Sequence, residues 1–215
     1  MSHRDPTHTR KSKQKNLSAL KKLPEKKAAS RSKKNIIIDV QPRKDLSSVI
    51  QLITRSVPDA PRTKMPADLK PMLATLVDEA FSDGDWQFEL KLDGYRALAY
   101  LKNGKVELRS RNNNSFNKKF GPVYTSLKEW NINAVVDGEI VVLNEEGVPD
   151  FNGIQLWEKQ KKGQLVFYVF DILWLEGIDL MQEPLFKRRD ILRQLIPGSG
   201  VVRFSDLPGL SRARG

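Results

Sequence analysis

Apolar residues gather in two long runs in the second half of the chain. Residues 134–143 are apolar except for the Asp137-Gly138-Glu139 tripeptide, and residues 165–175 carry Asp171 as their only charge. Runs of this length that are rich in β-branched and aromatic side chains predict largely buried strands. A charged pair inside such a strand costs free energy unless it meets a ligand or a metal. The tripeptide is therefore a candidate for chemistry.

A β-hairpin is predicted just upstream of these runs. Residues 96–101 alternate in character, and Asn103-Gly104 separates them from residues 106–108, in which Val106 and Leu108 flank a glutamate. This dipeptide is typical of a tight turn with positive φ at both turn residues. Because the two strands of a hairpin are antiparallel, we expect Arg96 and Arg111 to lie at the same end of it. Residues 145–147 predict a second hairpin turn.

Helical periodicity is weaker and more local. Residues 46–55 predict one amphipathic helix, and residues 185–196 predict another that is capped by Gly198. Residues 36–38 are consistent with a short strand. Strands therefore dominate, with helices between them, and the predicted fold class is α+β on antiparallel sheet.

Lys91 stands where a short predicted strand, residues 86–90, meets the turn pair Asp93-Gly94. This position suits a nucleophile, because a glycine turn lets the backbone approach a ligand closely. A lysine amine is normally protonated, so attack on phosphorus requires a lowered pKa, from desolvation or from a nearby positive charge such as Arg96. Without further motifs, a solvated lysine beside a turn explains the pattern equally well.

Charge divides the chain of 215 residues into two parts. Residues 1–70 hold 18 Lys and Arg against 6 Asp and Glu, whereas residues 71–215 hold 19 against 20. Residues 1–34 lack apolar periodicity, and we expect them to be disordered. Prolines at 58, 61, 66 and 71 precede the folded part, so we place the boundary near Pro66: a basic tail and linker over 1–65 and a domain over 66–215.

The basic tail has two interpretations. It is either a solubilising linker or an arm that binds phosphates by counterion release. The chain has no cysteine, which excludes disulfides and thiolate metal sites and agrees with a reducing cytosol. No run is long enough to span a bilayer, so we expect no membrane partner.

Ordered matches to one family support the catalytic interpretation of Lys91. Lys91-Leu92-Asp93-Gly94-Tyr95-Arg96 resembles the KxDGxR signature of ATP-dependent DNA ligases, and Ser110-Arg111-Asn112 resembles the short Ser-Arg element that follows it. Asp137-Gly138-Glu139-Ile140 resembles the third motif, and residues 167–173 resemble the aromatic strand after that motif. The resemblance covers about residues 70–209.

The resemblance is specific for the ligase domain of bacterial nonhomologous end-joining enzymes. In that group, Pro71-Met72-Leu73-Ala74 resembles the opening segment, and Asp150-Phe151 resembles the start of a helix after the third motif. It implies an antiparallel-sheet nucleotidyltransferase (adenylation) domain, ATP-grasp-like, that uses ATP with Mg²⁺ or Mn²⁺. It also implies a bacterial cytosolic protein that acts on nicked or broken double-stranded DNA in repair or recombination, with end-binding and polymerase proteins as possible partners.

The same resemblance assigns roles to residues. Lys91 would be adenylated, Glu89 or its backbone would meet the adenine edge, and Phe170 would stack on adenine, although packing in the core is the alternative for Phe170. Arg96 and Arg111 would contact sugar and phosphate. Glu139 would hold the metal or the ribose. The implied nucleotide-binding residues are Glu89, Leu90, Asp93, Arg96, Arg111, Glu139 and Phe170.

Asp93 has a structural role as a turn former, which is compatible with contact to the nucleotide, and Asp171 is expected to pair within the fold. The chain departs from the family after Arg203-Phe204, where we find no Glu-Gly-(Val/Leu)-x-x-Lys element, no strand with two lysines and no OB-fold lobe. We therefore expect an incomplete domain that binds ATP weakly and forms little Lys91 adenylate. Another lysine-dependent nucleotidyltransferase, such as an RNA ligase or a capping guanylyltransferase, and a non-catalytic DNA-binding fragment are the alternative functions.

Overall fold

The computed structural model of the protein describes residues 45–79, 89, 91–197 and 200–205. The elements are α1 (Leu46–Ser56), β1 (Tyr95–Lys102), β2 (Lys105–Ser110), α2 (Gly121–Glu129), β3 (Ala134–Leu143), α3 (Phe151–Gln160), β4 (Gln164–Leu175), β5 (Ile178–Asp179), α4 (Leu185–Leu195) and β6 (Val202–Phe204). The expectations for residues 1–34, for strands at 36–38 and 86–90, for Leu90 and for a cap at Gly198 fall outside the described residues.

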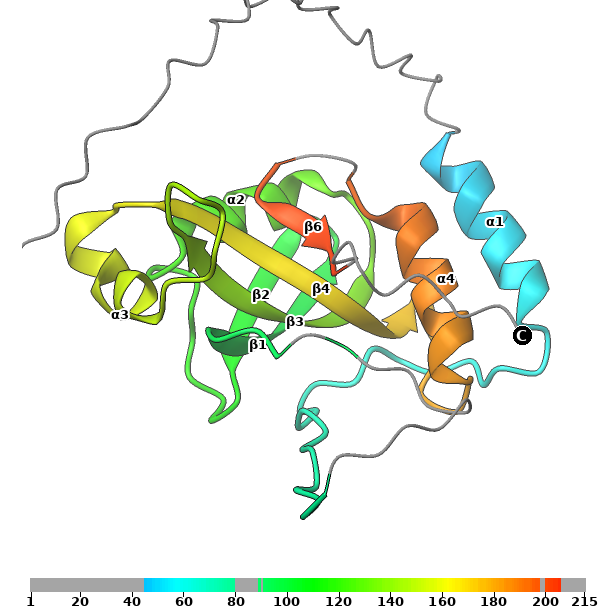
Figure 1. Cartoon of the computed structure of the whole chain (residues 1–215). Coiled ribbons are helices and arrows are strands. Elements are labelled where there is room, and N and C mark those ends of the chain that lie inside the picture. Colours follow the sequence, from blue (N-terminus) through cyan, green and yellow to red (C-terminus); the bar gives the residue numbers. More distant parts are fainter. Residues whose placement is uncertain (1–44, 80–88, 90, 198–199, 206–215) are drawn as a thin grey trace, which may run out of the picture. The chain divides into compact units, whose positions relative to one another are not determined.

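One mixed sheet organises the described residues. Its strands follow the order β2-β1-β3-β4-β5, and all of these neighbours are antiparallel. The short strand β6 pairs in parallel with residues 167–169 of β4, away from the residues of β4 that pair with β5 (Figure 1). The α+β class and the antiparallel sheet are confirmed. The parallel pair was not predicted. Parallel neighbours need a crossover, and α4 supplies it, because the chain passes through this helix between β5 and β6.

The hairpin between β1 and β2 forms as predicted. Asn103 and Gly104 have φ of 52° and 73°, the positive values that this turn requires. Ala97 pairs with Ser110, so the residues beside Arg96 and Arg111 lie at the same end of the hairpin. Arg96, in β1, and Arg111, directly after β2, therefore lie at the end of the hairpin opposite its turn.

The main hydrophobic core covers one face of the sheet. It contains inward-facing residues of β3 and β4 together with residues of α2 and α4. Val49 and Ile53 of α1 belong to the same core, and α1 contacts α4 (Figure 1). The packing of α1 therefore places this helix with the folded part, upstream of the boundary near Pro66 that composition predicted.

The second face of the sheet has two small apolar clusters with polar residues between them. At one end Leu98, Tyr100, Val135 and Trp174 pack together, and at the other Val141, Leu143 and Val166 do so. Side chains of a strand alternate between faces, so Asp137 and Glu139, which separate Val135 from Val141, project onto this second face. This polar stretch is where a site can form.

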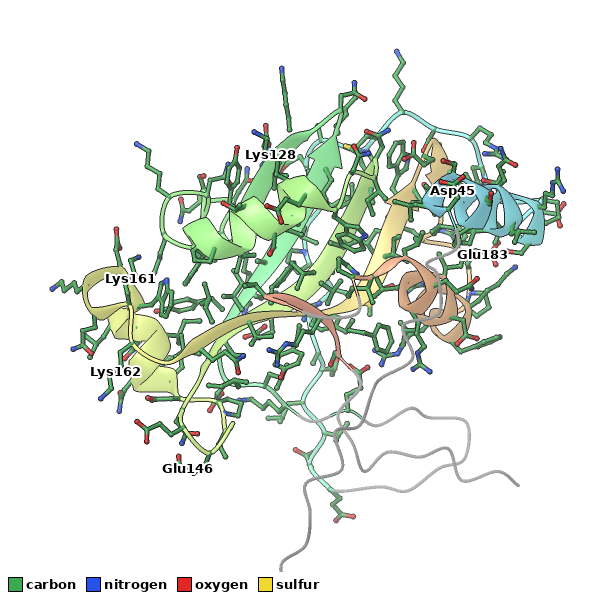
Figure 2. All side chains as sticks on the ribbon, turned by 90° about the horizontal axis from the view of Figure 1, so that it is seen from above. Asp45, Lys128, Glu146, Lys161, Lys162 and Glu183 are labelled. Carbon is green, nitrogen blue, oxygen red and sulfur yellow. The ribbon has the colours of Figure 1, made fainter. Side chains whose placement is uncertain are left out.

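Charged side chains otherwise lie mainly at the surface. Seen from above, Lys161 and Lys162 extend outward at the end of α3, and Glu183 lies next to α4 (Figure 2). In the described part of the chain, no helix has both the length and the apolar character required to cross a membrane.

Candidate functional site

Two glycines allow the backbone around the polar stretch to pack closely. A Cβ atom on Gly94 would lie 2.1 Å from the carbonyl oxygen of Ile140, and one on Gly138 would lie 2.4 Å from that of Tyr168. Any side chain at these two positions would therefore displace a neighbouring strand. The turn that carries Lys91 is held directly against β3 as a result.

Glu139 lies beside this turn. In the β1–β3 register it is opposite Arg96, and the backbone N–H of Gly94 acts to lower the pKa of its carboxyl group. Burial raises the pKa of Glu139 to about 7, against the positive charge of Arg96, while Asp137 adds to the shift. A carboxyl group whose pKa lies near neutral pH can bind a hydroxyl group in either protonation state, and it can bind a cation when it is ionised.

The Lys91 side chain is exposed to solvent. Its ammonium donates to the Asp93 carboxylate over 2.8 Å, and 86% of its side chain is exposed. The hydrogen bond and charge of Asp93 raise the pKa of Lys91. The lowered lysine pKa that attack on phosphorus requires is therefore not supplied by this arrangement, because the nearest charged partner of Lys91 is the Asp93 carboxylate and not an arginine.

Arg96 is engaged elsewhere. Its guanidinium donates to both oxygens of Asp137, over 2.6 and 2.8 Å, and lies 4.4 Å from the centroid of the Phe170 ring. Burial acts to lower the pKa of Arg96, but the hydrogen bonds and charge of Asp137 outweigh it and raise that pKa. This bidentate contact fixes the orientation of the guanidinium plane.

Phe170 comes from an irregular point of β4. Asp137 pairs with Asp171 whereas Gly138 pairs with Val169, so Phe170 is an extra residue in a β-bulge. It is half-buried and lies outside the hydrophobic clusters, with one ring face toward Arg96. Core packing therefore does not account for this aromatic residue.

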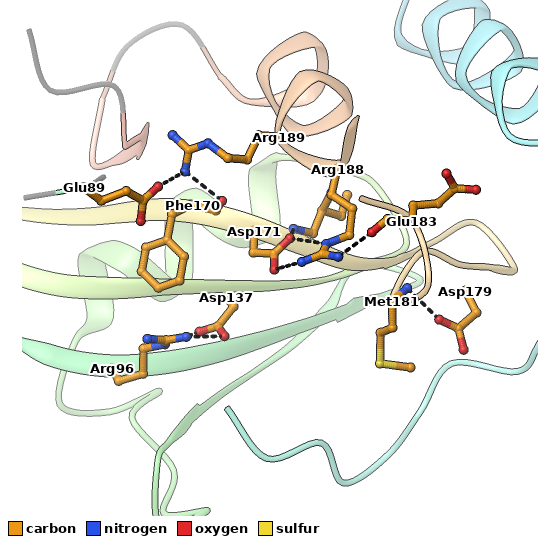
Figure 3. A network of polar contacts seen from close by, with 11 residues as sticks. Glu89, Arg96, Asp137, Phe170, Asp171, Asp179, Met181, Glu183, Arg188 and Arg189 are labelled. Carbon is orange, nitrogen blue, oxygen red and sulfur yellow. Dashed lines mark hydrogen bonds and ion pairs between the residues drawn. The ribbon is translucent and has the colours of Figure 1, made fainter. Parts of the chain in front are cut away.

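Two consecutive arginines of α4 complete the network, and sequence reasoning missed both. Arg188 donates to both oxygens of Asp171, over 2.7 and 2.8 Å, which confirms that Asp171 pairs within the fold. Arg189 donates to Glu89 and to the backbone carbonyl of Phe170 (Figure 3). A signal was present, since both arginines lie on the helical stripe that continues to Leu192.

Arg111 lies in a different environment. It lines an open pocket of about 490 Å³ together with Leu98, Arg109 and residues of the segment 68–73. The residues that line this pocket do not include Lys91 or Glu139. The sequence predicted that Arg96 and Arg111 lie at the same end of the hairpin, and they do. Only Arg111 lines this pocket, however, whereas Arg96 contacts Asp137.

Few carboxylates near Lys91 are available to bind a metal ion. Asp137 and Asp171 are each held by an arginine, and the described residues contain no cluster of three or more Asp, Glu or His side chains able to hold a metal. Glu139 is the remaining carboxylate of the polar stretch. Mg²⁺ commonly binds through one or two carboxylates plus phosphate oxygens, so this donor set fits an ion that arrives with a nucleotide.

Comparison with known proteins identifies related sequences. Residues 71–213 match the family described as ATP dependent DNA ligase domain. The multifunctional non-homologous end joining protein LigD of Pseudomonas aeruginosa is 37% identical over 148 residues, which are 67% of this chain and 18% of that protein. The LigD protein of Mycolicibacterium smegmatis is 36% identical over 148 residues, which are 67% of this chain and 19% of that protein.

A smaller relative and a solved structure extend the comparison. The SPbeta prophage-derived DNA ligase-like protein LigB of Bacillus subtilis is 30% identical over 131 residues, 59% of this chain and 47% of that protein. A mycobacterial DNA ligase D complexed with ATP and MES aligns with a TM-score of 0.46 and 29% identity, over 54% of this chain and 38% of that one. The chain thus spans about a fifth of the LigD relatives that it matches.

Proposed function

The chain belongs to the ATP-dependent DNA ligase domain family, and on this premise we propose that it carries the adenylyl-transfer site of a DNA ligase. Lys91 accepts AMP from ATP, and the AMP then passes to the 5′-phosphate of a break in double-stranded DNA. The observation that carries the proposal is the close packing of Gly94, in the Lys91 motif, against the Ile140 carbonyl of β3, next to Glu139.

The chemistry of the first step is a displacement at phosphorus. The Lys91 amine, once it has lost a proton to solvent, attacks the α-phosphorus of ATP, so that a P–N bond forms and the P–O bond to pyrophosphate breaks. Because the pKa of Lys91 is raised by Asp93, the ammonium form of Lys91 dominates. Deprotonation is therefore part of the cost of this step.

A divalent ion would be held by Glu139 and by the phosphates of the nucleotide. When bound, Mg²⁺ or Mn²⁺ neutralises charge on the triphosphate. Burial raises the pKa of Glu139 to about 7, so that its protonated and ionised forms are both accessible near neutral pH. It can therefore either bind such an ion or accept a hydrogen bond from a ribose hydroxyl.

The base would be held by residues at the other end of the polar stretch. Phe170, a half-buried ring beside Arg96, would stack on adenine, and Glu89 would offer a carboxylate for the adenine edge. Arg111 would meet sugar or phosphate from its own pocket. Arg96, held by Asp137, would present a fixed positive charge to the same region.

The macromolecular substrate is proposed from the relatives and from charge. Relatives named for non-homologous end joining point to broken double-stranded DNA as the substrate, in a repair reaction. Residues 1–70, with 18 Lys and Arg against 6 Asp and Glu, would supply the positive charge that attracts it. End-binding and polymerase proteins are candidate partners in such a reaction.

A non-catalytic role as an ATP-binding and DNA-binding fragment is the second candidate. The observation that favours it is the Lys91–Asp93 ion pair, which keeps the amine protonated. The two functions share the nucleotide site and differ in whether AMP becomes covalently attached.

Nucleotide binding by the full chain tests the shared site. Titration calorimetry with ATP and Mg²⁺ should detect binding, and Phe170→Ala should weaken it by roughly 1 to 3 kcal/mol, the scale of base stacking on an aromatic ring. Phe186→Ala is the matched control, because this exposed ring lies on α4. Equal affinity in Phe170→Ala and the wild-type chain would rule out stacking on Phe170, and preference for GTP over ATP would favour a guanylyltransferase.

A further inference from the structure

Arg189 is a buried charge in the middle of a helix. It is 6% exposed, and the adjacent Arg188 is also largely buried. Burying a guanidinium is costly unless its donors are satisfied, so the contacts of such a residue indicate what it is retained to hold.

The contacts of Arg189 join three segments that are distant in sequence. One terminal nitrogen donates to Glu89 Oε1 over 2.5 Å and to the Phe170 carbonyl over 3.1 Å, and the other donates to the Ser205 carbonyl over 3.0 Å. Its guanidinium carbon also lies 4.9 Å from the centroid of the Phe204 ring. One side chain thus fixes Glu89 and the bulge of β4 (Figure 3), together with the end of β6, relative to one another.

The bulge explains why Phe170 offers its carbonyl. As the extra residue between the Asp137–Asp171 and Gly138–Val169 pairs, Phe170 has no partner position on β3. A buried carbonyl that lacks a donor costs free energy, and Arg189 supplies the donor. The bulge therefore keeps its geometry, and the ring of Phe170 keeps its direction.

Glu89 is held at one oxygen and remains accessible. Oε1 accepts from Arg189, and the side chain is 40% exposed. An ionised carboxylate only accepts hydrogen bonds, so its other oxygen favours the exocyclic amino group of adenine and disfavours the carbonyl oxygen of guanine at the same position. This discrimination needs a carboxylate with a fixed place relative to the stacking ring.

We propose that Arg189 is a positioning residue that sets the preference of this site for adenine over guanine, by locking Glu89 and Phe170 in one arrangement. The proposal rests on the proposed function, because it concerns the base of the nucleotide that this site would bind. Arg189 itself touches neither the base nor the reacting atoms.

The experiment measures dissociation constants for ATP and GTP, with Mg²⁺, on the full chain and its variants. Arg189→Gln should lower the ratio of ATP to GTP affinity by about tenfold, and Arg189→Lys, which keeps the charge but not the fork, should fall between it and the wild type. Lys187→Gln is the matched control, since it removes a cation of the same helix that pairs with Glu183. It should leave the ratio unchanged.

A second variant tests the proposal in case Arg189→Gln does not fold. Glu89→Gln lies at the more exposed end of the contact and should lower the ATP preference while Arg189 is intact. With Arg189→Lys it should act non-additively, because both changes disrupt one unit. Additive effects, or a wild-type ratio in folded Arg189 variants, would overturn the proposal. A wild-type chain that binds no ATP would overturn the proposed function, and this inference with it.

Discussion

Lys91 and Asp93 form an ion pair that works against the nucleophile. A carboxylate 2.8 Å from the amine favours the charged form, and the pKa of Lys91 is raised. Since the lysine must lose its proton to react, its reactivity should be suppressed until the pH approaches that raised pKa. Nucleotide binding that draws Asp93 away would release the amine.

Replacing Asp93 should therefore move the titration of Lys91. We predict that Asp93→Asn lowers the pKa of Lys91, so that acetylation of this amine by acetic anhydride, followed by peptide mass spectrometry, begins at a lower pH than in the wild type. Asp59→Asn, which changes an exposed carboxylate elsewhere, should leave the profile unmoved. Identical profiles for Asp93→Asn and the wild type would show that Asp93 does not control this amine.

The raised pKa of Glu139 leads to a separate prediction about the stability of the fold. Its pKa is raised from 4.5 to about 7 in the folded chain, so between these values the folded state binds more protons than the unfolded state. Stability from this group is present at low pH and is lost as the pH rises through that window. Glu139→Gln should remove this dependence and stabilise the chain at pH 8 by roughly 1 to 2 kcal/mol, allowing for solvent screening.

Urea unfolding of both chains at pH 5 and pH 8 measures the effect. The two chains should differ little at pH 5 and clearly at pH 8, with the variant the more stable. A variant that is less stable than the wild type at pH 8 would mean that the ionised carboxylate is favourable where it lies, and would contradict the assignment of burial as the dominant cause.

Short motifs supply the candidate residues of the site, whereas the partners of those residues come from elsewhere in the chain. Lys91, Asp93, Glu139 and Phe170 belong to short contiguous motifs, and the structure shows that Phe170 lies in a β-bulge. Arg189 was missed because its partner Glu89 is 100 positions away. Pairing at such separation is set by how α4 packs on β4, which no local pattern encodes.

The pairing of β3 with β4 depends on a glycine. A Cβ atom at Gly138 would lie 2.4 Å from the carbonyl oxygen of Tyr168 and 2.6 Å from a ring carbon of Phe167. We predict that Gly138→Ala destabilises the chain by about 3 kcal/mol, since an added methyl group must push a buried strand aside. Chemical denaturation followed by circular dichroism measures this.

Gly121 provides the matched control for that substitution. Nothing lies within 4 Å of a Cβ atom built at Gly121, which begins α2, so Gly121→Ala should leave stability unchanged or raise it by less than about 1 kcal/mol. Equal stability of Gly138→Ala and Gly121→Ala would show that β3 and β4 can separate at this point without cost.

The elements themselves were largely predictable. Residues 134–143 form β3 with the predicted bounds, and the Asn103-Gly104 turn has the backbone that its sequence requires. The parallel pairing of β6 was not predictable, because a strand of 3 residues carries too little pattern. The packing of α1 into the core was also missed, since amphipathicity indicates a buried face but not the surface that buries it.

Charge separates the two parts of the chain. Residues 1–34 hold 12 Lys and Arg against 2 Asp and Glu, whereas residues 71–215 hold 19 against 20. We predict that deleting residues 1–34 lowers DNA affinity at low salt and flattens the plot of log affinity against log salt, while ATP binding is unchanged. Filter binding across a salt series measures both. An unaltered slope would assign DNA contact to the rest of the chain.

Covalent attachment of AMP to Lys91 tests the central claim most directly. The full chain is incubated with ATP and Mg²⁺ at several pH values, and its intact mass and tryptic peptides are measured by mass spectrometry. We predict that one AMP is attached at Lys91 in a small fraction of molecules, that this fraction grows with pH because the pKa of Lys91 is raised, and that Lys91→Ala carries none. An adduct on another residue, or no adduct at any pH, would contradict adenylyl transfer by this site.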